Sequence, residues 1–242
     1  MTDTTDLTAV HAAIDALYDA TQRLVRSVDT MTDDTWHGDS LLPGWTRAHL
    51  VAHLTLNAEG LAGSLEGLRQ GRGVPMYPSA EARDHDIEEL SGAAVPVVRD
   101  RLLGSVSRFA DAVAAMDDQE WSRRIDRVPG GPTFRAAAVP AMRWREVEIH
   151  HVDLAVGYGH QDWPHAFAEA TVDSMAARLA DLSPGFRLLL TDAGRERDVG
   201  NVAPDAPVVR GSAADTARWL SGRGDGTGMS SEGGDLPQIG AW

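Results

Sequence analysis

Residues 40–71 read SLLPGWTRAHLVAHLTLNAEGLAGSLEGLRQG, a segment that carries the start and stop signals of one long helix. Pro43 and Gly44 mark a turn, Thr46 is of the type that caps a helix N-terminus, and Gly71 is of the type that ends one. The segment between these signals has no proline and is rich in alanine and leucine. It therefore predicts a helix over about residues 46–70.

Three more helical segments flank this one. Apolar residues recur every three or four positions over residues 7–31, and again over residues 95–116, where a helix that begins near Ser79 is broken around Gly92 and Pro96. A last helix is expected from Arg135 or Pro140 to about residue 156, before Gly157. Four long amphipathic helices predict an N-terminal four-helix bundle.

The pattern changes in two places. The sequence DRVPGGPTF, residues 126–134, is turn-rich and predicts a short hairpin or an extended connection. After Gly157 come a polar linker, a helix over residues 165–182, alternating segments typical of short strands, and a helix that begins at Ser212 and ends in glycine. We therefore predict an α+β protein with a bundle domain over residues 1–158 and a small α+β domain over residues 159–242.

Composition restricts the classes of function. The chain has 242 residues, a formal net charge of -14 and no lysine, so a surface this acidic is expected to repel nucleic acid and anionic lipid. From the charge alone, the partner we expect is a small molecule or another protein. The sequence has no basic, apolar leader and no apolar run of membrane-spanning length, which predicts a cytoplasmic protein.

The chain has no cysteine, which excludes disulfides, iron–sulfur clusters and a cysteine nucleophile. Thiol chemistry would need an external thiol. A metal ion would have to be bound by histidine and carboxylate side chains, and nine histidines are present.

Two helices carry candidate metal ligands. His49, His53 and Asn57 follow one another at one-turn spacing and form a polar stripe on an apolar helix, so they need partners. In RWREVEIHHVDL, Glu146 and His150 are at i and i+4 and project from one face. The spacing is compatible with a three-ligand metal site, but also with a solvated Glu–His contact and with histidines that serve only the core or the surface.

Two further residues with metal-binding side chains lie close to His150 in the sequence. His151 points about 100° away on an ideal helix, which indicates a neighbour of the site and not a second ligand. Asp153 lies about one turn beyond His150, where it would either orient a ligand imidazole or remain a solvated acid.

The glycine-rich GRGDGTG, residues 222–228, lacks the lysine and the spacing of a phosphate-binding loop.

Residues 42–60, LPGWTRAHLVAHLTLNAEG, and residues 143–159, RWREVEIHHVDLAVGYG, resemble the two signature segments of the mycothiol-dependent maleylpyruvate isomerase family. The N-terminal part of that family is a DinB-like metal-binding bundle. The segments GSAADTARWLSGRGDGTG and LPQIGAW resemble its small C-terminal domain. The resemblance covers nearly the whole chain and is densest in the two histidine segments.

By position in these motifs, the resemblance implies metal ligands at His53, Glu146 and His150, with zinc as the expected ion. It assigns His49 a structural or supporting role. Arg83, in EARDHDIE, and Arg223, in SGRGDGTG, resemble the positions at which the family places arginines that face the site, and they are expected to act in catalysis and in cofactor binding.

The resemblance further implies conversion of maleylpyruvate to its trans isomer fumarylpyruvate in gentisate breakdown, with mycothiol as cofactor. Rotation about the double bond requires a temporary single bond, which an added thiolate creates. A mycothiol-dependent S-transferase that acts on other electrophiles would use the same residues. A non-enzymatic metal-binding protein is a further alternative, but it would leave the open coordination position and the arginines unexplained.

Overall fold

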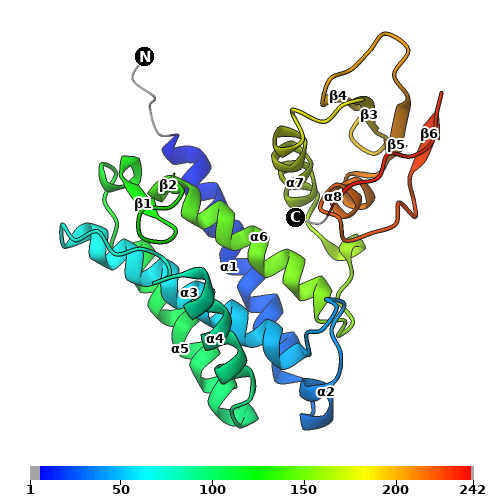
Figure 1. The fold of residues 1–242 in the computed structure, drawn as a ribbon. Helices are drawn as coiled ribbons and strands as arrows, with labels where there is room; N and C mark the ends of the chain where they lie inside the picture. The colour runs from blue at the N-terminus through cyan, green and yellow to red at the C-terminus, as the bar shows by residue number, and fades with distance from the viewer. Residues whose placement is uncertain (1–5, 241–242) are drawn as a thin grey trace. The chain divides into compact units, whose positions relative to one another are not determined.

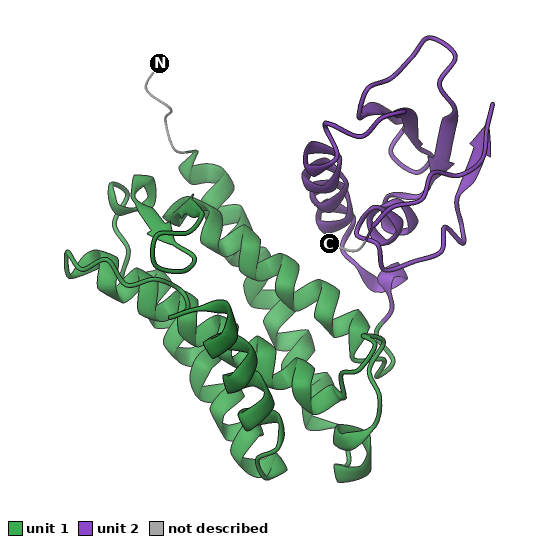
Figure 2. Ribbon diagram, in the orientation of Figure 1, with its two compact units in different colours: residues 1–158 green, residues 159–242 purple. Residues whose placement is uncertain are grey.

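The computed structural model describes residues 6–240. The chain divides into two compact units, residues 1–158 and residues 159–242 (Figure 2). The first unit is helical with a small hairpin and the second combines helices with a sheet, so the predicted α+β class is confirmed. The segment LPQIGAW, residues 236–242, lies partly outside the described residues.

The first unit is a bundle in which a central helix contacts four others (Figure 1). The central helix α3 packs on α5, α4, α6 and the short α2, and α1 packs on α6. In chain order the elements are α1 (Leu7–Asp29), α2 (Asp33–His37), α3 (Arg47–Arg69), α4 (Ala80–Ser91), α5 (Val95–Ala114), η1 (Glu120–Ser122), β1 (Arg124–Asp126), β2 (Thr133–Arg135), η2 (Ala136–Ala138) and α6 (Val139–Asp153).

The central position of α3 follows from its sequence. It buries residues on most of its circumference, as a helix that is apolar nearly all round is expected to do. Its N-terminus begins at the predicted cap Thr46, whose hydroxyl accepts a hydrogen bond from the backbone N–H of His49. His53 and Asn57 are carried into the interior on this helix, which makes their polar partners a structural requirement.

The helix expected over residues 95–116 is separate from the one that begins at Ser79. The chain leaves the helical path after Gly92, and Pro96 lies in the first turn of α5, where a missing N–H costs nothing. Pro140 occupies the same position in α6, so of the two predicted starts of that helix the later one is correct. The short α2, which buries Trp36, was not predicted from the sequence.

The loop between α3 and α4 lies directly against α3. A Cβ atom at Gly60 would come within 2.6 Å of the backbone oxygen of Met76, so only glycine permits this approach. On its other side the loop donates hydrogen bonds of 3.0 Å from the N–H groups of Met76 and Tyr77 to the oxygens of Asp126 and Arg127. The predicted hairpin is present, because β1 pairs antiparallel with β2, and it helps to hold Tyr77 in place.

The second unit contains η3 (His160–Asp162), α7 (His165–Arg178), β3 (Phe186–Leu190), β4 (Arg195–Val199), β5 (Val208–Gly211), α8 (Ala213–Leu220) and β6 (Ser230–Glu232). Its sheet has the order β4-β3-β5-β6, with β3 parallel to β5 and the other pairs antiparallel. The predicted strands and helices are present, but α7 ends at Arg178 and not at residue 182 as expected. The sequence does not predict β6, because its residues, Ser-Ser-Glu, show no alternation of apolar and polar side chains.

No helix within residues 6–240 is both long and apolar enough to cross a membrane.

Candidate metal centre

Three donor side chains converge between α3 and α6. The ligand-type atoms of His53, Glu146 and His150 all lie within 4.8 Å of one another. Glu146 Oε2 lies 2.9 Å from Nε2 of His53 and 3.2 Å from Nε2 of His150. The two imidazoles are buried, and the carboxylate is mostly buried. The structure thus brings together the three residues that the resemblance implies as ligands.

Burial and hydrogen bonding set the charges of this cluster. Burial lowers the pKa of His53 to about 4, so this ring is neutral near pH 7. Burial would raise the pKa of Glu146, but the hydrogen bonds with His150 and His53 hold it well below its usual value. The cluster therefore presents an ionised carboxylate and a neutral imidazole with a lone pair.

His150 is oriented by a second carboxylate. Its Nδ1 lies 2.9 Å from Oδ2 of Asp153, which is buried and so is not the solvated acid of the alternative interpretation. Burial lowers the pKa of His150, but the hydrogen bonds with Asp153 and Glu146 outweigh it and raise the pKa overall. When the ring is neutral, a proton on Nδ1 directed at Asp153 leaves the lone pair on Nε2, the arrangement typical of a metal-binding histidine.

The donor set fits a divalent metal. Two imidazole nitrogens and one carboxylate oxygen are the ligands of catalytic zinc sites, which leave a fourth position for water or substrate. The contacts between Glu146 Oε2 and the two Nε2 atoms bring all three donors to one point. A cation at that point would replace protons that the imidazoles and the carboxylate otherwise share.

His49 and His151 have other partners. His49 Nδ1 accepts a hydrogen bond from the backbone N–H of Thr46 at 3.2 Å and completes the capping box of α3, and its Nε2 lies 3.1 Å from Glu88 Oε2. His151 stacks on Tyr158 and its Nε2 lies 2.8 Å from Ser27 Oγ on α1. Neither belongs to the cluster.

Arg83, on α4, reaches the edge of the cluster. One guanidinium nitrogen lies 3.3 Å from Nδ1 of His53, and another donates to Asp84 Oδ1 at 2.6 Å. The guanidinium also lies 5.8 Å from the centre of the Tyr77 ring. Tyr77 was not predicted as a site residue, and burial raises the pKa of its hydroxyl. Arg83 is thus a cationic side chain beside the cluster.

A second buried polar pair lies one turn along both helices. Arg143, three residues before Glu146, donates a 2.8 Å hydrogen bond to Oδ1 of Asn57, four residues after His53. The polar stripe on α3 predicts that Asn57 needs a partner, and the structure identifies that partner as Arg143. The spacing of 143, 146 and 150 on α6 places all three on one helix face and could have identified it.

Arg223 belongs to the second unit, where it follows α8 and its backbone N–H donates to the oxygen of Arg218 at 3.1 Å. Its role at the cluster stays a prediction.

The fold and the cluster define a helical-bundle protein with a buried donor set for a divalent cation. The profile described as the mycothiol maleylpyruvate isomerase N-terminal domain matches residues 17–155. The chain belongs to this family. No protein of curated function matches the chain.

Two solved structures are similar over nearly the whole chain. One is described as the crystal structure of the mycothiol-dependent maleylpyruvate isomerase, with a TM-score of 0.88, 28% identity, and coverage of 96% of this chain and 97% of that chain. The other is described as a histidine-to-alanine mutant of the mycothiol-dependent maleylpyruvate isomerase, with a TM-score of 0.87, the same identity and the same coverage. The similarity includes both units.

Proposed function

We propose that this protein is a mycothiol-dependent isomerase that converts maleylpyruvate to fumarylpyruvate at a zinc site formed by His53, Glu146 and His150. The observation that carries the proposal is the convergence of these donors within 4.8 Å in a chain that has no cysteine. Family membership and the similarity to a maleylpyruvate isomerase along the whole chain support the substrate and the thiol.

The three side chains fit the metal in number and type. When bound there, zinc would lower the pKa of an incoming thiol and so supply thiolate near neutral pH. The chain's own contribution is to orient the donors: Asp153 fixes the ring of His150, and α3 and α6 fix the spacing of the imidazoles.

The isomerisation needs no net change in the thiol. The thiolate sulfur forms a bond to one carbon of the cis double bond, and the electron pair of that bond moves into the conjugated carbonyl to give an enolate. The remaining carbon–carbon single bond rotates. The enolate then re-forms the double bond in the trans configuration and expels the thiolate, so the thiol is regenerated unchanged.

Arg83 is suited to hold the anionic substrate through this sequence. Its guanidinium lies at the edge of the cluster, where it can pair with a substrate carboxylate or with the enolate oxygen as charge develops. We assign the same task to Arg223 because of its motif position.

The test is turnover of maleylpyruvate by zinc-loaded protein with and without mycothiol, followed by NMR of the vinyl protons, whose coupling distinguishes cis from trans. We expect a rate that rises with mycothiol concentration and is negligible without it. Turnover independent of any thiol would refute the mechanism. Consumption of mycothiol with other electrophiles, without isomerisation of maleylpyruvate, would identify an S-transferase instead.

A further inference from the structure

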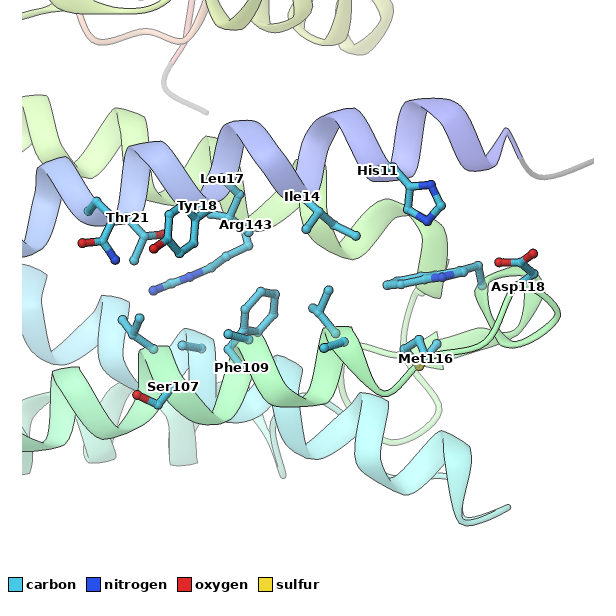
Figure 3. A pocket seen from close by; sticks show the side chains of 17 residues that line it. His11, Ile14, Leu17, Tyr18, Thr21, Ser107, Phe109, Met116, Asp118 and Arg143 are labelled. Atoms are coloured by element: carbon cyan, nitrogen blue, oxygen red, sulfur yellow. The ribbon is translucent and has the colours of Figure 1, made fainter.

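The first unit also contains a pocket, which is lined mainly by α1 and α5 (Figure 3). Its volume is about 450 Å³, within the range of pockets that bind small molecules. Most of its wall is apolar, and it includes Ile14, Leu17, Phe109, Val113 and Trp121. Neither His53 nor His150 lines this pocket. The pocket is therefore separate from the candidate metal centre.

The pocket contains one buried cation. Arg143 is 2% exposed, and its side chain extends into the pocket between Tyr18 and Thr21 of α1 and Phe109 of α5 (Figure 3). A guanidinium has five N–H donors. Among residues 6–240 its single hydrogen-bond acceptor is Oδ1 of Asn57, at 2.8 Å, and no carboxylate forms an ion pair with it.

A buried charge without a counter-ion is costly, and proteins normally pair it. Burial lowers the pKa of Arg143 to about 10, while the negative charge of Glu146 opposes that shift, so the side chain remains cationic near pH 7. Asn57 is the one protein acceptor of this guanidinium among residues 6–240, and the side chain borders a cavity with mostly apolar walls. This arrangement lacks an anion.

We propose that this pocket binds a monocarboxylate with an apolar body, whose carboxylate pairs with Arg143 and whose body packs on Phe109 and Trp121. A carboxylate matches the fork of a single guanidinium and carries the one charge that is required. A phosphate dianion would need further donors, and the lining residue Asp118 would repel it. The aryl or alkyl body accounts for the apolar walls.

The test uses calorimetric titration of the full-length protein with octanoate and phenylbutyrate, and with octanol and phenylbutanol, which differ only in the charged group. Each acid should bind about tenfold to a hundredfold more tightly than its alcohol, because a charge-assisted hydrogen bond separates them. Arg143→Met should remove this difference. The titration needs no thiol, metal or maleylpyruvate, so its outcome is independent of the proposed isomerase activity.

Ala110→Phe is the second variant. Ala110 is an exposed residue of α5 that lines the pocket, so a phenyl ring there should fill it and abolish binding of all four compounds while Arg143 remains. Ala12→Phe, at an exposed position of α1 that does not line the pocket, is the matched control and should bind as the unchanged protein does. Equal affinity for acids and alcohols, no binding of either acid, or acid binding that survives Ala110→Phe would each overturn the proposal.

Discussion

Nδ1 of His150 lies 2.9 Å from Oδ2 of Asp153, and this contact determines which ring nitrogen faces Glu146. Removing it with Asp153→Ala should lower zinc affinity by about tenfold to a hundredfold, because the ring loses both its orientation and the charge that raises its basicity. The zinc affinity of Asp153→Asn should lie between those of Asp153→Ala and the unchanged protein, since the amide oxygen can still accept a hydrogen bond from Nδ1–H. Competition with a chromophoric chelator measures both, and Asp111→Ala, at an exposed position, serves as control. Unchanged affinity in Asp153→Ala would show that the contact has no role in metal binding.

Substitution of the ligands themselves should cause a larger loss of zinc. His53→Ala and His150→Ala should each leave the protein without stoichiometric zinc, because two donors are too few for a stable site. His49→Ala is the matched control from the same helix, since His49 caps α3 and pairs with Glu88 outside the cluster. Elemental analysis of the purified variants decides between these outcomes. Retention of zinc in both ligand variants would refute the assignment, and loss in His49→Ala would move the ligand by one turn.

Local signals made much of this site predictable from the sequence. Thr46 begins α3 and Pro140 lies in the first turn of α6, and regular helices then place His53, Glu146 and His150 by their spacing. Convergence on one point additionally requires that α3 packs on α6, which a bundle makes reasonable but does not specify.

Other site residues depend on long-range contacts. Tyr77 lies against Arg83, beside the cluster, because Gly60 lets its loop approach α3 and because the hairpin accepts its backbone hydrogen bond, and no local pattern encodes either fact. Arg143 is hard to predict for a different reason: its spacing places it on the face of Glu146 and His150, but arginine is rarely fully buried, so the sequence alone favours a surface position.

The close approach at Gly60 predicts opposite effects of the same substitution in one helix. Gly60→Ala should lower the free energy of unfolding by about 1 to 3 kcal/mol, because the new methyl group meets the backbone oxygen of Met76 at 2.6 Å. Gly63→Ala should raise it by up to about 1 kcal/mol, since its nearest neighbour is the flexible Arg108 side chain at 3.7 Å and alanine favours the helix. Urea denaturation measures both. A stabilising Gly60→Ala would mean that the loop does not lie against α3.

The lowered pKa of His53 predicts acid sensitivity of the metal-free protein. Its pKa is about 4 when folded and 6.5 when unfolded, so the unfolded state binds the extra proton and stability falls as the pH drops from 6.5 toward 4. The loss across this window is about 3 kcal/mol. The raised pKa of His150 changes stability above pH 6.5, and the lowered pKa of Glu146 changes it below pH 4.5. Neither group therefore accounts for the main loss of stability between pH 6.5 and 4.

Urea denaturation of chelator-treated protein at several pH values should therefore show a smaller acid loss in His53→Gln than in the unchanged chain. His37→Gln replaces an exposed histidine of α2 and should leave the loss as it is. The same pH slope in His53→Gln and in the unchanged chain would contradict the assignment.

Arg83 separates metal binding from catalysis. Its guanidinium lies 3.3 Å from Nδ1 of His53, where it places a positive charge beside the cluster, so Arg83→Ala should leave zinc affinity unchanged or higher. Activity should nevertheless fall about tenfold to a hundredfold, because a charge-assisted contact to a carboxylate or an enolate is worth roughly 1.5 to 3 kcal/mol. We expect the same pattern from Arg223→Ala. Arg108→Ala removes an arginine whose partner is Glu66 on the surface, and its activity should match that of the unchanged protein. Steady-state kinetics with maleylpyruvate and mycothiol, alongside zinc analysis of each variant, tests this division: if Arg83→Ala loses zinc together with activity, the residue supports the metal centre and does not hold the substrate.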